Sequence, residues 1–176
     1  MVESSCIEEM RKLKVYVETS FVCYLTGDPT PNAKIAADQA YTRQWWNDNA
    51  NRLDVCVSEF VATECEVGRM DAVARRLEIV RMLHLIEPDV AEVSSLAKKL
   101  IAAYALPEGE TTDALHIAAA SVSGMDYLLT WNCKHMANPH TLPKTRQIVR
   151  EAGYVCPLIM TPKTFIENEN MEVANG

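Results

Sequence analysis

Short apolar runs alternate with longer amphipathic segments along this chain. Five of the runs are rich in β-branched and aromatic residues, and they predict strands at 15–18, 53–58, 83–88, 126–131 and 154–160. Between them, apolar residues recur at the spacing of a helix face, most cleanly over 93–104. Strands that alternate with helices are typical of βαβ units, so the pattern predicts an α/β fold with a parallel sheet covered on both faces.

Capping residues predict where several helices begin and end. Asn32 is placed to cap one long helix, Asp71 to cap another, and Asp89 to cap a third in which Glu92 completes a capping box. Gly68 is a stop signal for the helix that Ser58 begins. Further helices are predicted over 19–26, 33–50, 113–124 and 142–152.

Length and composition indicate one ordinary globular domain. The chain has 176 residues, of which 48% are apolar and 23% charged. We expect an N-terminal extension over 1–13, a single domain over 14–165 and a polar, disordered tail over 166–176. No apolar run reaches the roughly 20 residues of a membrane span, and the first residues lack a signal-peptide core, so we expect a cytoplasmic protein.

The six cysteines are not arranged as a recognisable metal motif. None belongs to a CxxC pair or to a Cys/His set with zinc spacing. Cys23, Cys56 and Cys65 lie in apolar surroundings, where a thiol behaves as a small hydrophobic group. We therefore expect reduced, structural thiols, which is the usual state of cysteines in the cytosol.

Charge argues against broad wrapping of a polyanion but leaves a local basic segment. The formal net charge is −7, whereas a general nucleic-acid binder usually has a basic excess. Residues 131–150 nevertheless contain no Asp or Glu. We expect four side chains of this segment to contact RNA phosphates or to line a site, the alternative being a solvated helix face. They are Lys134, His135, Lys144 and Arg146.

Acidic and amide side chains lie where predicted strands end and helices start. Glu18 ends the first strand, Glu64 lies two turns into the helix after the second strand, Asp113 opens a helix and Asn132 follows the fourth strand. Ligands of parallel sheets gather at the carboxyl ends of the strands. Three converging carboxylates repel one another unless a cation joins them, and Mg²⁺ or Mn²⁺ prefers such oxygen ligands. Such an ion would activate a water for phosphodiester hydrolysis.

Each acid also has a simpler interpretation. Glu18 and Asp113 stand near helix starts, where a carboxylate is stabilised by the helix dipole. Glu18 is also placed to pair with a nearby lysine. Glu64 is placed to pair with an arginine or to be solvated. Spacing alone therefore leaves the metal cluster as one of two interpretations for each residue.

One histidine and a pair of tryptophans can also be interpreted either as functional residues or as core residues. His116 shares a helix face with Asp113 and could orient that carboxylate, but a hydrogen-bonded core histidine is favoured. Trp45 and Trp46 point in different directions on a helix, so one is expected in the core. The other is a candidate for base stacking or for a protein interface.

Four segments resemble the successive motifs of PIN-domain ribonucleases, and most closely the VapC-like toxins of bacterial toxin–antitoxin pairs. The segments are "VYVETSFVCYL", "SEFVATECEVG", "TTDALHIAAA" and "DYLLTWNCKHMAN", within a similarity that runs from about residue 14 to 165. The resemblance implies a three-layer α/β/α sandwich with a short parallel sheet and metal-dependent RNA cleavage by clustered acids. It also implies a homodimer and a small antitoxin partner.

The resemblance assigns roles to five residues. Glu18 stands at the first acid position, Glu64 at the acid six residues after Ser58, and Asp113 at the acid that starts the "DALHIA" helix. Asn132 stands where many members have a fourth aspartate, and Ser20 stands where a hydroxyl often hydrogen-bonds within the site. The resemblance therefore predicts Mg²⁺ or Mn²⁺ on Glu18, Glu64 and Asp113.

Two departures from the family pattern affect this expectation. Glu18 replaces aspartate and moves the carboxylate by roughly 1.3 Å, whereas Mg²⁺ requires near-ideal octahedral distances. Asn132 removes one charge, so the site fits one divalent ion better than two. The leading hypothesis is a metal-dependent endoribonuclease. The alternatives are a non-catalytic scaffold that binds RNA or a protein, and a nuclease that cleaves structured DNA.

Overall fold

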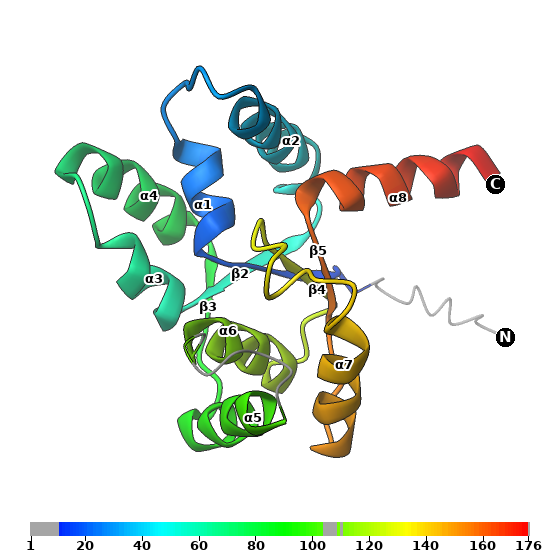
Figure 1. The fold of residues 1–176 in the computed structure, drawn as a ribbon. Helices are drawn as coiled ribbons and strands as arrows, with labels where there is room; N and C mark the ends of the chain where they lie inside the picture. Colours follow the sequence, from blue (N-terminus) through cyan, green and yellow to red (C-terminus); the bar gives the residue numbers. More distant parts are fainter. Residues whose placement is uncertain (1–10, 104–108, 110, 176) are drawn as a thin grey trace, which may run out of the picture.

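The chain forms a single five-stranded parallel sheet enclosed by helices (Figure 1). The computed structural model describes residues 11–103, 109 and 111–175. The strand order is β3-β2-β1-β4-β5, and every neighbouring pair is parallel. The five predicted strands are confirmed, although the last three are shorter than predicted. Their bounds are β1 (Lys14–Val17), β2 (Asp54–Ser58), β3 (His84–Ile86), β4 (Tyr127–Leu129) and β5 (Leu158–Met160).

The helices divide between the two faces according to the direction of the strand connections. From β1 the chain moves outward to β2 and β3, and it then crosses back to β4 and β5 on the other side of β1. Right-handed crossovers in opposite directions place their helices on opposite faces. The first group is α1 (Thr19–Thr26), α2 (Ala33–Asn49), α3 (Glu59–Cys65) and α4 (Met70–Met82). The second group is α5 (Val90–Ala102), α6 (Thr111–Val122) and α7 (Leu142–Glu151).

Figure 1 shows the two groups on opposite sides of the sheet, with α8 (Pro162–Asn175) beside α2. Helix α3 touches both α4 and α6, so it lies at the edge where the two layers approach each other. The predicted three-layer α/β/α sandwich with a short parallel sheet is therefore confirmed.

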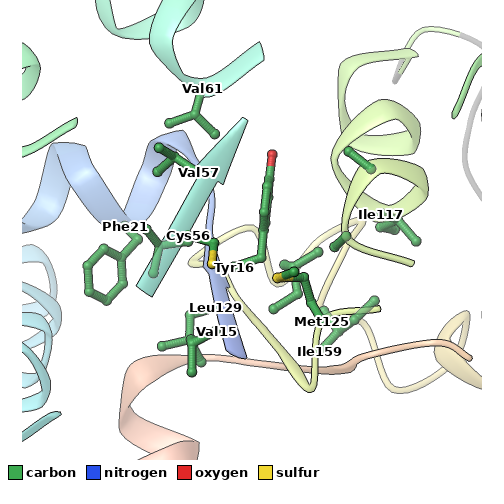
Figure 2. Close-up of a cluster of buried hydrophobic side chains, with 14 of the residues drawn as sticks. Val15, Tyr16, Phe21, Cys56, Val57, Val61, Ile117, Met125, Leu129 and Ile159 are labelled. Carbon is green, nitrogen blue, oxygen red and sulfur yellow. The ribbon is translucent and has the colours of Figure 1, made fainter. Parts of the chain in front are cut away.

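The centre of the core is strand β1. Val15, Tyr16 and Val17 are completely buried, which is typical of a central parallel strand covered on both faces. Successive side chains point to opposite faces, so Tyr16 stands on the side of α6 while its neighbours face the other layer. Figure 2 shows Tyr16 between β2 and α6, near Ile117. This direction brings a phenol hydroxyl to the end of the sheet where the acids were predicted.

Of the four predicted N-caps, two are confirmed and one is wrong, while Ser58 stands at the N-cap position of α3 without a capping hydrogen bond from its side chain. Oδ1 of Asn32 accepts hydrogen bonds from the N–H groups of Lys34 and Ile35, at 3.0 and 3.1 Å. Asp89 accepts one from the N–H of Glu92 at 2.9 Å. Asp71 does not cap its helix, because α4 already begins at Met70 and Asp71 lies in its first turn.

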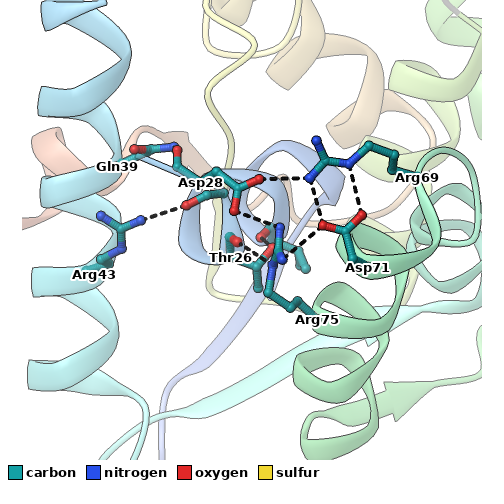
Figure 3. A network of polar contacts seen from close by, with 9 residues as sticks. Thr26, Asp28, Gln39, Arg43, Arg69, Asp71 and Arg75 are labelled. Atoms are coloured by element: carbon teal, nitrogen blue, oxygen red, sulfur yellow. Dashed lines mark hydrogen bonds and ion pairs between the residues drawn. The ribbon is translucent and has the colours of Figure 1, made fainter. Parts of the chain in front are cut away.

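Polar contacts fix the C-terminal end of α1 to α4 and α2 (Figure 3). Arg75 donates to the carbonyl of Thr26 at 3.2 Å and to the carboxylate of Asp28 at 3.0 Å. Arg69 reaches Asp28 at 3.1 Å, and Arg43 of α2 donates to the carbonyl of Gly27 at 2.9 Å. These contacts hold the orientation of α1, whose other end carries Glu18.

The predicted disorder of the tail over 166–176 is wrong for its described part, which forms α8. The reason lies in three aromatic rings. Phe165 packs edge-on against Trp45 of α2 and against Tyr127 of β4, with ring centroids 5.7 and 5.0 Å apart. Burying this ring anchors the first turn of α8, and an ion pair between Arg52 and Glu169 holds the helix further along. The composition of the tail does not reveal these distant partners.

Two further observations complete the fold. Over the described part of the chain, no helix combines the length and the apolar character that a membrane crossing requires. The five described cysteines are free thiols, and they are Cys23, Cys56, Cys65, Cys133 and Cys156. Cys6 lies outside the described residues. Helix α5 was predicted to continue to Tyr104, which also lies outside them, and its described part ends at Ala102.

Candidate functional site

The candidate site lies at the carboxyl ends of β1, β2 and β4. Strand β1 pairs with β2 on one side and with β4 on the other, and the connections that follow β1 and β4 run in opposite directions across the sheet. Such a reversal of strand order opens a crevice at the carboxyl edge of a doubly wound sheet. Glu18 follows β1 directly, Ser58 ends β2, and Asn132 is the third residue after β4. The fold thus places the predicted acids at the edge where ligands bind.

Glu18 is buried and caps helix α1. Its carboxylate accepts a hydrogen bond from the N–H of Ser20 at 2.8 Å and a second from the Ser20 hydroxyl. The Ser20 hydroxyl also accepts a hydrogen bond from the N–H of Trp131 at 2.8 Å. The interaction with the helix start that the simpler interpretation proposed is therefore present. Ser20 in addition ties the end of β1 to the segment after β4.

Glu64 is held by two donors on different elements. Its Oε2 lies 2.8 Å from Nε2 of His116 on α6, and it accepts a hydrogen bond from the Thr19 hydroxyl on α1. Burial by itself raises the pKa of Glu64, but the hydrogen bonds from His116 and Thr19 outweigh it, so the pKa lies below its ordinary value. Glu64 is therefore held as a carboxylate, the form that binds a cation.

A buried polar chain supports Glu64 from the core. The Tyr16 hydroxyl lies 2.8 Å from Nδ1 of His116 and 2.7 Å from the hydroxyl of Ser58. A neutral His116 that donates from Nε2 to Glu64 can accept at Nδ1 from Tyr16, which leaves every group of the chain paired. Burial and the charges of Glu18 and Glu64 raise the pKa of Tyr16, so the phenol keeps its proton.

The core position favoured for His116 is thus confirmed, because only 2% of the residue is exposed. Both of its ring nitrogens are engaged, by Tyr16 and by Glu64, so Glu64 is the carboxylate that it orients. Sequence reasoning missed this contact and the Thr19 contact. A helical position three residues after Asp113 shows which face His116 shares, but not which distant side chain meets it.

Asp113 and Asn132 are joined directly. The Asn132 amide donates from Nδ2 to the Asp113 carboxylate at 2.8 Å, while its Oδ1 accepts from the N–H of His135 at 3.1 Å. The N–H of Asn132 donates to the Thr130 hydroxyl at 2.9 Å. These contacts fix the orientation of the amide, so Asn132 acts here as a hydrogen-bond donor to Asp113.

The donor set fits Mg²⁺ or Mn²⁺ in its chemistry. Glu18, Glu64 and Asp113 offer carboxylate oxygens, the ligands that these hard ions prefer. An ionised carboxylate has about four acceptor positions, so the hydrogen bonds described above leave further positions for a cation. Their oxygens do not all approach within 4.8 Å of one another. Among the described residues, that spacing is reached by a different cluster, Asp54, Cys56 and His84. The three acids share this edge of the sheet, and each accepts hydrogen bonds from neighbouring groups.

The predicted basic residues separate into two places. Lys134 is exposed and His135 is half-buried, and both belong to the loop that carries Asn132. Lys144 and Arg146 are exposed on α7. Arg146 lines a different hollow, together with Arg150, Tyr154 and Cys156. Lys134 and His135 are therefore the basic candidates that lie near Asn132 in the chain.

An aromatic pair stands beside the site. Tyr24 of α1 and Trp131 stack with their ring centroids 5.5 Å apart and their planes at 23°. Both rings are half-buried, and Nε1 of Trp131 donates to the Thr42 hydroxyl at 2.8 Å. The expectation that one tryptophan of the adjacent pair lies in the core is confirmed, because Trp45 is fully buried and Trp46 is not.

Comparisons with known proteins agree with this architecture. No protein-family model and no curated protein matches the chain. Among solved structures, the chain is similar to the Mycobacterium tuberculosis toxin VapC20, which cleaves the sarcin-ricin loop. The TM-score is 0.52 and the sequence identity is 16%, and the match covers 69% of this chain and 92% of VapC20. It is also similar to VapBC2 from Rickettsia felis bound to a DNA fragment from its promoter, with TM-score 0.51, 14% identity and coverage of 85% and 98%.

The parallel sheet, its strand order and the acids at its carboxyl edge define an α/β protein of the doubly wound class. The similarity to these solved structures identifies the type of α/β fold. The chain has a PIN-like fold of the VapC type, as its four motifs indicated.

Proposed function

We propose that this protein is a metal-dependent endoribonuclease that acts as a VapC-like toxin in the cytoplasm. The observation that carries the proposal is a set of hydrogen bonds, in separate parts, that holds the acids at one edge of the sheet. One part runs from Glu18 through Ser20 to the backbone of Trp131, and another runs from Asp113 to Asn132. Hydrogen bonds of this kind hold carboxylates that would otherwise repel one another, and they do so at the edge where doubly wound sheets bind ligands.

The proposed side chains have two roles: some bind the ion, and others orient the ligands. Glu18, Glu64 and Asp113 hold Mg²⁺ or Mn²⁺, which when bound polarises a phosphodiester and lowers the pKa of an attacking water. His116 and Thr19 orient Glu64 and keep it ionised. Asn132 orients Asp113 through its amide. Ser20 holds Glu18 in place, and the longer side chain of Glu18 is accommodated by this cap.

RNA contacts are assigned to the residues that surround the acids. Lys134 and His135 lie on the loop after β4 and are suited to bind phosphates. The stacked pair of Tyr24 and Trp131 offers an aromatic surface for a base. Lys144 and Arg146 extend the positive charge along α7, at a greater distance along the chain from the acids. The segment 131–150 is positively charged, and this local charge supports RNA binding although the whole chain has a net charge of −7.

Partner proteins are proposed from the neighbours. The Rickettsia felis structure is a VapBC assembly bound to promoter DNA, so we propose an antitoxin that covers the site of this chain. We also propose a homodimer, in keeping with the family that the motifs resemble. Size-exclusion chromatography with light scattering tests the dimer independently of catalysis.

The deciding experiment is cleavage of a mixed pool of labelled RNAs with Mg²⁺ or Mn²⁺. Cleavage should be lost in EDTA and in Asp113→Asn, while circular dichroism shows the variant to be folded. Calorimetry should show weaker binding of the ion by Asp113→Asn, and equal affinity would remove Asp113 from the site. A matched control is Asp48→Asn, which removes the same charge from an exposed position on α2.

A second function, a scaffold that binds RNA or a protein without cleavage, is favoured by one observation. Each of the four positions already has a structural partner. Ser20 donates to both oxygens of Glu18, and Asn132 donates to Asp113. Glu64 lies against His116 and accepts from Thr19. RNA binding that persists in EDTA, without cleavage of any RNA in the pool, would favour the scaffold. Cleavage of single-stranded RNA but not of branched DNA would separate the proposal from a structure-specific DNA nuclease.

A further inference from the structure

A second cluster of metal-binding side chains lies at the opposite end of the sheet. Asp54 is the first residue of β2 and His84 is the first residue of β3, whereas the acids lie beyond the carboxyl ends of the strands. Asp54 and Cys56 are two residues apart on β2 and therefore share one face of the sheet. Cys56 is paired with His84 in the register of β2 and β3, so all three side chains emerge on the same face.

The three donor atoms lie at distances that suit one small ion. Nδ1 of His84 lies 3.2 Å from Oδ1 of Asp54 and 3.9 Å from Sγ of Cys56. In a tetrahedral zinc site, bonds of about 2.0–2.3 Å would separate N from O by roughly 3.3 Å and S from N by roughly 3.6 Å. All the donor atoms lie within 4.8 Å of one another, and no other such group of His, Cys, Asp or Glu side chains occurs in the described part of the chain.

We propose that Asp54, Cys56 and His84 form a zinc site that joins β2 to β3. A thiolate, an imidazole and a carboxylate are the three ligand types that zinc accepts in proteins, and the thiolate discriminates against Mg²⁺ and Ca²⁺. The remaining tetrahedral position is left to water. The site is independent of the proposed nuclease centre in both location and ligand chemistry.

The surroundings give an ion access. Cys56 and His84 line an open hollow of about 570 Å³, whose rim also includes Asp89 and Glu92 of the α5 start. The His84 side chain is 58% exposed, while Cys56 is buried at the base. The acids on the rim favour a cation, and Lys14, which also lines the hollow, opposes it. Burial, with the charge of Asp54 second, raises the pKa of Cys56 to about 12, so a bound ion must displace the thiol proton.

The role that follows is structural. Strand β3 has three residues and forms one edge of the sheet, with β2 as its single neighbouring strand. An ion bound by both strands would hold this edge in register and would stabilise the folded chain, because it binds the folded state more tightly than the unfolded chain. The competing interpretation is an ordinary surface ion pair between His84 and Asp54 beside a core thiol.

The test is a cobalt titration of the full chain after removal of metals. We expect one equivalent of Co²⁺ to produce a thiolate-to-cobalt charge-transfer absorption, and we expect Zn²⁺ to displace it and raise the midpoint of thermal unfolding. The absorption should disappear in Cys56→Ala. In His84→Asn, at an exposed position that should not disturb folding, affinity should fall by roughly 100-fold or more, because loss of even an outer-shell partner costs about 10–100-fold.

Two controls make the outcome unambiguous. Cys133→Ala removes the exposed thiol and should leave the absorption unchanged. Asp113→Asn should also leave it unchanged, so loss of nuclease activity and loss of the zinc site are separately visible. Absence of the absorption in the unmodified protein, or its persistence in both Cys56→Ala and His84→Asn, would overturn the zinc site and leave the ion pair with a core thiol.

Discussion

Nε2 of His116 lies 2.8 Å from Oε2 of Glu64, and this contact joins the buried core to the candidate acid site. The His116 side chain is 2% exposed, whereas that of Glu64 is 36% exposed. The acid therefore reaches solvent while its orienting partner is sealed in the interior. The site is positioned by the core and not by its surface loops alone.

Replacing His116 by alanine should destabilise the fold by about 1–3 kcal/mol, because the Tyr16 hydroxyl loses a buried partner. Urea unfolding measures the change. His140→Ala, at an exposed position, is the control and should stay within about 0.5 kcal/mol of the parent. A His116 variant as stable as the control would show that the buried chain contributes nothing.

The same substitution should raise the pKa of Glu64, since the hydrogen bond from His116 is the foremost of the influences that lower it. A lowered pKa stabilises the folded state at pH values above the unfolded pKa of about 4.3, and this contribution is lost as the pH falls through the folded pKa. Carboxyl NMR titration of the parent and of His116→Ala checks the direction. An unchanged Glu64 pKa would contradict the assigned hydrogen bond.

Asn132→Asp should make stability depend on a divalent ion. The amide that donates to Asp113 becomes a second carboxylate, so in EDTA we expect a loss of about 1–3 kcal/mol through repulsion and the lost hydrogen bond. Mg²⁺ should restore the loss by joining the two acids.

Thermal unfolding with and without Mg²⁺ measures this effect. Asn51→Asp adds the same charge at an exposed turn and should show no such dependence. Equal stability of Asn132→Asp and the parent in EDTA would show that the Asp113 contact has no energetic consequence.

Phe165→Ala should cost about 3–5 kcal/mol, because the ring is buried against Trp45 and Tyr127. The loss should release α8 before the sheet unfolds, and amide hydrogen exchange across 162–173 would detect it. Val173→Ala on the same helix removes an 82% exposed side chain and should have little effect. Equal exchange in both variants would contradict the anchoring of α8 by Phe165.

Asp71 should stabilise the folded chain at mildly acidic and neutral pH, and this contribution should be lost in strong acid. The hydrogen bond from Arg69 is the main cause that lowers the Asp71 pKa to about 2, and the charges of Arg69 and Arg75 add to it. A lowered pKa contributes stability above the unfolded value of about 3.9, and that contribution disappears as the pH falls towards 2. The difference in unfolding free energy between the parent and Asp71→Asn should therefore be present at pH 5 and absent near pH 2. A difference that is independent of pH would refute the assignment.

The sequence by itself determined the order of strands and helices along the chain, the two-sided sheet and the edge at which Glu18 and Asn132 lie. These features follow from local patterns, because side-chain periodicity reports which faces are buried and parallel strands end at one edge. The caps at Asn32 and Asp89 are local in the same sense. Motifs separated along the chain were sufficient to indicate the PIN-like fold.

Only the tertiary structure decided which distant side chains touch. His116 meets Glu64 across 52 positions, and Cys56 meets His84 across 28, because strand register and helix packing bring them together. The tail became α8 for the same reason, since Phe165 finds its partners on α2 and β4. Such contacts depend on the direction and spacing of elements in space, and no periodicity within a single segment encodes them.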